Sequence, residues 1–204
     1  MQPHHPILHV APADLRPTQL TVGYAEVAAK RAEWKRLGKK KRKELLAGHW
    51  FPAVLGPQQA CHIVDHHHLG LALLEEGVAS VPVVVLRDFS WLPPEEFWRA
   101  MEFYQWAHPY DVQNQRRHCS EFPRSLTELQ DDPYRSFAAR VQDAGGYAKD
   151  ALPYAEFMWA GFLREHFKLR RNERLSASRL ARAVTLAHGR AAAYLPGWSG
   201  KHHV

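Results

Sequence analysis

One stretch of the sequence decides the fold: HIVDHHHLGLALL, residues 62–74. Ile63 and Val64 are β-branched and close a predicted hairpin with residues 51–55, across a turn that contains Gly56 and Pro57. The apolar residues that follow Asp65 recur at helical spacing up to Gly77, so we expect Asp65 to cap a helix that ends there. The run VPVVVL, residues 81–86, then predicts a buried strand.

The chain on either side of this stretch extends the same pattern. Upstream, residues 7–10 and 18–22 are typical of short strands, and a helix is predicted from Tyr24 with an interruption at Gly38. Downstream, the pattern becomes helical after Asp88, with helices expected to begin near residues 93, 132 and 153 and a last one over residues 175–194. We therefore predict an α+β fold: a small mixed sheet with helices over residues 1–90, and a helical half over residues 91–204 packed on it as one structural unit.

Length and composition agree with this expectation. A chain of 204 residues with 46% hydrophobic residues can bury one sizeable core. The longest apolar run is far shorter than the roughly 20 residues of a membrane span, and residues 1–6 have no secretory pattern. We expect a cytoplasmic protein without a membrane partner, in which Cys61 and Cys119 remain thiols.

Positive charge is concentrated in two segments. Nine Lys and Arg residues lie between residues 30 and 43, and a second group runs from Arg164 to Arg190, within a formal net charge of +6. The first segment could bind nucleic acid without sequence preference. Such a run is more commonly a solvated helix face.

The turn that starts at Asp65 is the candidate functional site. A loop that leaves a strand and enters a helix turns free backbone N–H groups and the positive end of the helix dipole toward one place, which favours phosphate. His66, His67 and His68 could donate hydrogen bonds to phosphate oxygens, and Asp65 could orient a histidine, hold Mg²⁺ or act as a base. Two alternatives stay open: a simple helix cap with surface histidines, or a transition-metal site made by two histidines and a distant carboxylate.

Several blocks of the sequence resemble the ParB-like nuclease family of the ParB/sulfiredoxin superfamily. The turn at residues 65–69 matches the family's Asp-x-His-His-Leu, and residues 14–23 look like its N-terminal box. Residues 131–136, 145–149 and 154–160 are similar to its C-terminal blocks, so the resemblance covers residues 7–165.

The resemblance implies nucleotide phosphate at this turn, because the superfamily includes CTP-hydrolysing partition proteins, sulfinic-acid reductases and free-serine kinases. The kinases carry Asp-Gly-His-His-Arg here, so His66 replaces their glycine and Leu69 their arginine. Glu26 lies where those kinases are expected to place a carboxylate near the reacting hydroxyl. Gln19 could contact the nucleotide or its own backbone, and four residues of the C-terminal blocks could close the site: Asp132, Arg135, Lys149 and Glu156.

We therefore expect a nucleotide-dependent phosphotransferase or phosphohydrolase that acts on a small hydroxyl-bearing substrate. It would use ATP, ADP or CTP, with Mg²⁺ at Asp65. The alternatives are a ParB-like DNA-binding protein or nuclease, and a nucleotide sensor without turnover. No paired-ligand motif predicts structural zinc.

Overall fold

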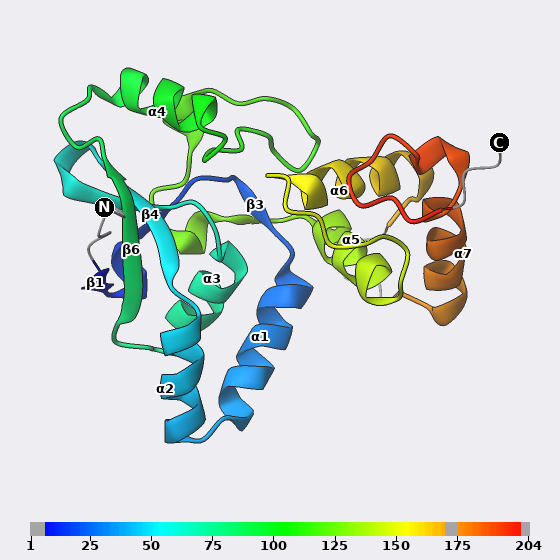
Figure 1. Ribbon diagram of the computed structural model, residues 1–204, viewed down its shortest axis with the longest axis horizontal. Coiled ribbons are helices and arrows are strands. Elements are labelled where there is room, and N and C mark those ends of the chain that lie inside the picture. The colour runs from blue at the N-terminus through cyan, green and yellow to red at the C-terminus, as the bar shows by residue number, and fades with distance from the viewer. Residues whose placement is uncertain (1–6, 170–174, 201–204) are drawn as a thin grey trace, which may run out of the picture. The chain divides into compact units, whose positions relative to one another are not determined.

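The computed structural model describes residues 7–169 and 175–200, and the chain divides into two compact units, residues 1–131 and 132–204 (Figure 1). The residue-90 boundary expected from the sequence falls inside the first unit. The chain beyond residue 90 stays with the sheet because helix α4 (Pro94–Phe103) packs on it and strand β7 (Gln130–Asp131) pairs with strand β3 (Thr21–Val22). Arg170, Arg171 and Arg174 of the second basic group lie outside the described residues, as do residues 1–6.

The first unit contains a mixed five-stranded sheet, whose strands lie in the order β1 (Ile7–Val10), β6 (Val81–Asp88), β4 (Phe51–Gly56), β5 (Ala60–Ile63) and β2 (Leu15–Pro17). β1 and β6 are antiparallel, as are β4 and β5, whereas β6 runs parallel to β4, and β5 runs parallel to β2. This arrangement confirms the α+β fold class. The other helices of the unit are α1 Tyr24–Arg36, α2 Lys39–Gly48, α3 His67–Glu75 and the 3₁₀ helices Pro12–Asp14, Pro57–Gln59, Cys119–Glu121 and Leu126–Glu128.

Helices α3 and α4 pack on opposite faces of this sheet. On one face, Gly70 of α3 lies so near Phe51 and Ile63 that an added Cβ would come within 3.3 Å and 3.6 Å of their side chains. On the other face, His62 contacts Phe97 of α4, with ring centroids 4.6 Å apart. Neighbouring residues of one strand point to opposite faces, so Ile63 and His62 mark the two sides.

Local signals in the sequence correctly placed two helix ends in this unit, but of the strand predicted over residues 18–22 only Thr21–Val22 forms. The predicted break at Gly38 separates α1 from α2. Gly77 adopts a left-handed conformation, with φ of 65°, just after α3, and Val78 N–H bonds back to Leu73, the hydrogen bond expected of a helix C-terminus.

In the described residues, no helix is long and apolar enough to span a bilayer.

The second unit is helical, as the sequence predicted, and consists of α5 Pro133–Asp143, α6 Ala155–His166, α7 Ala177–Ala187 and a 3₁₀ helix at Arg190–Ala192. Its own apolar core includes Phe137, Trp159 and Leu163. The ring of Trp159 stacks on Tyr147 at a centroid distance of 4.0 Å. The last helix was predicted over residues 175–194, but α7 ends at Ala187 because the chain turns at Gly189.

The burial of His62 should make the stability of the first unit depend on pH. Burial, and to a lesser extent the charge of Arg16, lower the pKa of His62 to about 4. The unfolded chain then binds more protons than the folded one as pH falls from about 6.5 toward 4, so stability is complete above that window and is lost within it. We expect a loss of about 2 kcal/mol between pH 7 and pH 5 from this group.

Urea unfolding of the wild type and of His62→Gln at several pH values would measure this effect. Glutamine cannot titrate, so the variant should lose less stability over the same range. Parallel pH profiles for the two proteins would contradict the assignment.

Candidate functional site

The helix α3 begins one residue later than the sequence predicted. Its N-cap is His66, which adopts the left-handed conformation with φ of 64° and ψ of 24° and makes no side-chain capping hydrogen bond. Asp65 is exposed, and its Oδ1 accepts the N–H of His66 at 2.6 Å. The expectation that Asp65 caps α3 was therefore wrong, because its carboxylate is engaged by the adjacent residue.

The left-handed His66 occupies the position where the free-serine kinases carry glycine. A residue with a Cβ pays roughly 1 to 2 kcal/mol for this conformation, and strained residues of this kind cluster at functional sites. Its ring lies against Phe51 and His49, at centroid distances of 5.8 Å and 6.0 Å. These contacts help to hold the turn in its conformation.

We expect His66→Gly to raise stability by roughly 0.5 to 1 kcal/mol, because glycine adopts this backbone conformation without strain. The matched control is Gln105→Gly, since Gln105 also has a positive φ, of 56°, in the turn after α4. Urea unfolding would compare them. A lower stability for His66→Gly alone would show that the ring contacts outweigh the backbone strain.

His67 is buried and fastens the β2–β3 connection to α3. Its Nε2 accepts the N–H of Thr18 at 3.1 Å, and the Thr18 hydroxyl lies 3.4 Å from the same nitrogen while donating to the Ile63 carbonyl at 2.8 Å. A ring nitrogen that accepts an N–H carries no proton, so the neutral ring is protonated on Nδ1. His67 thus positions the backbone around Thr18, and its predicted contact with phosphate stays a prediction.

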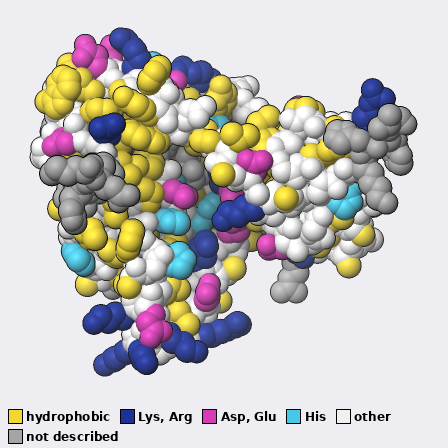
Figure 2. All heavy atoms as spheres, viewed as in Figure 1, with side chains coloured by type: hydrophobic (Ala, Val, Ile, Leu, Met, Phe, Trp, Pro, Cys, Tyr) yellow, Lys and Arg dark blue, Asp and Glu magenta, His cyan; other side chains and the backbone are white. Residues whose placement is uncertain are grey.

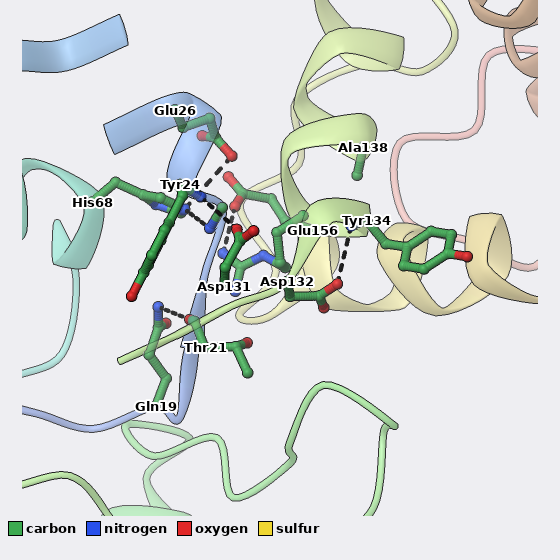
Figure 3. A network of polar contacts seen from close by, with 12 residues as sticks. Gln19, Thr21, Tyr24, Glu26, His68, Asp131, Asp132, Tyr134, Ala138 and Glu156 are labelled. Atoms are coloured by element: carbon green, nitrogen blue, oxygen red, sulfur yellow. Dashed lines mark hydrogen bonds and ion pairs between the residues drawn. The ribbon is translucent and has the colours of Figure 1, made fainter. Parts of the chain in front are cut away.

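His68 makes the corresponding connection to the start of α1. Its Nε2 accepts the N–H of Gly23 at 2.9 Å, and Glu26 Oε1 lies 3.5 Å from the same nitrogen (Figure 3). One nitrogen cannot accept an N–H and donate to a carboxylate at once. We assign the acceptor role, because the Gly23 contact is shorter and has the geometry of a hydrogen bond. Protonation of His68 would instead form an ion pair with Glu26.

These contacts bring the N-termini of α1 and α3 together. His68 joins the two helix starts, and further along the helices Arg31 pairs with Glu75 and Glu76, at 2.7 Å each. The start of α1 contacts the start of α3, and a later residue of α1 contacts the end of α3, so the two helices run parallel. Their positive dipole ends therefore lie side by side at His68 and Gly23.

Two residues near this point were missed by sequence reasoning. Asp131 Oδ1 accepts the N–H of Tyr24 at 2.8 Å (Figure 3). The Tyr24 hydroxyl donates to the Leu129 carbonyl at 2.8 Å. Burial, followed by the charges of Asp131 and Glu75, raises the pKa of Tyr24, which keeps its phenol a donor. Asp131 reaches α1 only because β7 pairs with β3, and a two-residue strand leaves no sequence signal.

The other predicted residue of the first unit, Gln19, is turned to its own backbone. It is buried, and its Nε2 donates to the Thr21 carbonyl at 2.8 Å. Of the two interpretations left open by the sequence, the structure shows the local hydrogen bond. A contact with nucleotide remains a prediction.

The four remaining candidates belong to the second unit, where three of them anchor its helices. Asp132 caps α5, because its Oδ1 accepts the N–H of Tyr134. Its Oδ2 forms an ion pair with Arg164 Nη2 at 2.5 Å. Arg135 is buried over the Phe157 ring and donates to Glu156 at 3.1 Å, but its Nε and Nη1 have no hydrogen-bond partner among the described residues. Lys149 lies exposed in the loop after α5. That these residues close the site stays a prediction.

The side chains of the described residues were compared with the ligand groups that hold metal ions. Among the described residues, no group of three or more His, Cys, Asp or Glu side chains could hold a metal ion. Mg²⁺ in nucleotide sites commonly uses one or two carboxylates together with substrate phosphates and water. The carboxylate of Asp65 fits such a role, since it is exposed beside the start of α3.

The comparison with family models decides the affiliation of the chain. The model described as "Putative ParB-like nuclease" matches residues 8–165. The chain belongs to this ParB-like family. The resemblance predicted from the blocks at residues 7–165 is thereby confirmed.

A solved structure extends this likeness beyond the family match. The ParB-like chain is similar to the crystal structure of protein Atu1540 from Agrobacterium tumefaciens, with 40% sequence identity and a TM-score of 0.88. The match covers 97% of this chain and 99% of the other. A search of curated proteins found no match.

Proposed function

We propose that this ParB-like protein binds a nucleoside di- or triphosphate at the adjoining N-termini of α1 and α3. The protein then transfers a phosphoryl group from this nucleotide to a small hydroxyl-bearing substrate or to water. The observation that carries the proposal is the parallel pairing of the two helices through His68 and Gly23. Two positive dipole ends disfavour each other and are stabilised together by an anion between or beside them.

The side chains at this place suit a phosphoryl transfer. Glu26, about a quarter exposed, would take the proton of the attacking hydroxyl, whose oxygen then forms the new bond to phosphorus while the rest of the nucleotide leaves. Asp65 would help to hold Mg²⁺, whose charge offsets that of the phosphates.

A change of charge at the start of α1 tests the binding site without damage to the helix. Ala25 is exposed in the first turn of α1. Ala25→Glu places a carboxylate where it favours the helix but repels phosphate, whereas Ala25→Gln is its neutral match. We expect calorimetry with ATP, ADP and CTP, each with Mg²⁺, to show at least tenfold weaker binding for Glu than for Gln.

The control for distance is Ala29→Glu, which puts the same charge one turn further along α1, also in an exposed position. It should bind nucleotide like the wild type. The proposal fails if the wild type binds none of the three nucleotides at millimolar concentration, or if the two variants at residue 25 bind equally.

A second candidate function is DNA binding, and one observation favours it. Helix α2 begins with five cationic residues, 39–43, and has no acidic residue in its first turn and no side-chain cap. Cations at a helix N-terminus are unfavourable, so an anionic partner would relieve their repulsion. Lys and Arg side chains gather at the tip of the α1–α2 hairpin (Figure 2), although Arg31 and Lys35 are paired with Glu75 and Glu76 at the C-terminal end of α3.

We expect any such binding to be sensitive to salt and indifferent to sequence, because no base-reading element accompanies the charges. Fluorescence anisotropy with a panel of duplexes at two salt concentrations would measure it. Replacing Lys39, Lys40, Lys41 and Lys43 by Gln should reduce the salt dependence. A strong preference for one duplex that survives high salt would contradict this view, and cleavage of the duplexes would favour a nuclease.

A further inference from the structure

The face of the sheet that carries α4 contains a pocket separate from the phosphate site. This pocket, here called the α4-face pocket, has a volume of about 480 Å³ and includes His62, Trp98, Phe122, Cys119, Arg16 and Arg124 in its wall. His62 and Arg16 are cross-strand partners on β5 and β2, on the side opposite Ile63 and α3. The volume falls within the range of small-molecule sites, roughly 300 to 1,000 Å³.

One side of the α4-face pocket is flat and aromatic. The rings of Trp98 and Phe122 stack at a centroid distance of 4.1 Å, and His62 meets the Trp98 ring edge-on at 5.4 Å. Gly56 makes room for this arrangement, because a Cβ there would approach His62 to 2.7 Å and Phe97 to 2.8 Å. Such a surface suits a planar apolar group.

The polar part of the wall is cationic. Arg16 donates to the Arg124 backbone carbonyl, which ties the two residues together. Among the described residues, neither guanidinium forms an ion pair with a carboxylate, and the wall contains no acidic side chain. His62 adds no charge near neutral pH, because burial lowers its pKa to about 4.

We propose that the α4-face pocket binds a small aromatic carboxylate, with its ring against Trp98 and Phe122 and its carboxylate at Arg16 and Arg124. A planar guanidinium fork matches a carboxylate in two hydrogen bonds. The aromatic wall thus favours the ring of the ligand, and the two guanidinium groups favour its carboxylate. This ligand site shares no residue with the proposed nucleotide site.

Cys119 provides a readout located in the pocket. It is partly exposed, whereas Cys61 is buried and its thiol pKa is raised to about 11 by that burial. Alkylation near neutral pH therefore reports on Cys119. Ligand in the pocket should slow this alkylation.

The experiment measures binding of benzoate and 2-naphthoate to the full chain by calorimetry, together with protection of Cys119 from iodoacetamide. The neutral probe 2-naphthalenemethanol and the dianion phenyl phosphate are the comparisons. Arg16→Gln should weaken carboxylate binding about ten- to a hundredfold, because a charged hydrogen bond is lost. Arg87→Gln, an exposed change on β6 outside the pocket wall, should not.

The outcomes separate the proposal from its alternatives. Carboxylate binding that protects Cys119 and needs Arg16 supports it. Equal binding of the neutral alcohol, preference for phenyl phosphate, or the absence of binding by both carboxylates at millimolar concentration would overturn it. Circular dichroism of each variant confirms that a loss is not unfolding.

Discussion

Replacing Glu26 by Gln is expected to lower the rate of nucleotide turnover by a factor of about 100 to 10,000, the usual contribution of a general base. The side chain keeps its size and loses only the carboxylate that lies 3.5 Å from His68 Nε2. Nucleotide affinity should not fall, because no phosphate contact is assigned to Glu26 and the variant removes a negative charge that repels phosphate at the start of α1. Phosphate release from ATP, ADP and CTP, with candidate hydroxyl compounds present, measures the rate.

The matched control is Glu33→Gln, an exposed acid on the same helix α1. It removes the same charge away from the helix start and should leave turnover unchanged. If the wild type binds nucleotide but shows no turnover, the protein is a sensor and the catalytic part of the proposal is wrong. If Glu26→Gln turns over normally, another group is the base.

A comparably large effect is expected in the second unit, on stability. Asp132→Ala should destabilise that unit by about 3 kcal/mol, because it leaves the charge of Arg164 without its buried partner and removes the cap of α5. Asp132→Asn keeps an oxygen for the Tyr134 N–H and should lose about 1 kcal/mol less. Urea unfolding, followed by Trp fluorescence and by a probe placed in the second unit, measures the difference.

This comparison also tests the predicted role of Asp132 in closing the site. If Asp132 only anchors the helices, both variants should lower the stability of the second unit, and the folded protein should bind nucleotide like the wild type. Loss of nucleotide binding in Asp132→Asn without loss of stability would give Asp132 a direct role at the phosphates.

Local signals in the sequence were enough for most of the fold. The breaks at Gly38 and Gly77 and the start of α5 near residue 132 depend on one or two residues each, so they could be predicted directly. The boundary between the units could not. It depends on β7, two residues long, returning to β3 across more than a hundred residues of chain, and sequence periodicity carries no information on such a pairing.

The contacts within the candidate site were not foreseen from the sequence. The cap assigned to Asp65 failed because His66 adopts a conformation that a residue with a Cβ rarely adopts. The histidines were expected to donate, whereas His67 and His68 accept backbone amides of Thr18 and Gly23. Those acceptor roles require that a distant loop lie against α3, and only the tertiary structure reveals it.

The amide-accepting histidines have a consequence for metal chemistry. A transition metal binds imidazole through an unprotonated nitrogen, and in His67 and His68 that nitrogen, Nε2, already receives a backbone N–H. A metal ion could take either ring only by displacing a peptide group that would then need another acceptor, at a cost of about 1 to 3 kcal/mol for each buried group. The turn with three successive histidines is therefore a much poorer ligand for zinc or nickel than its composition indicates.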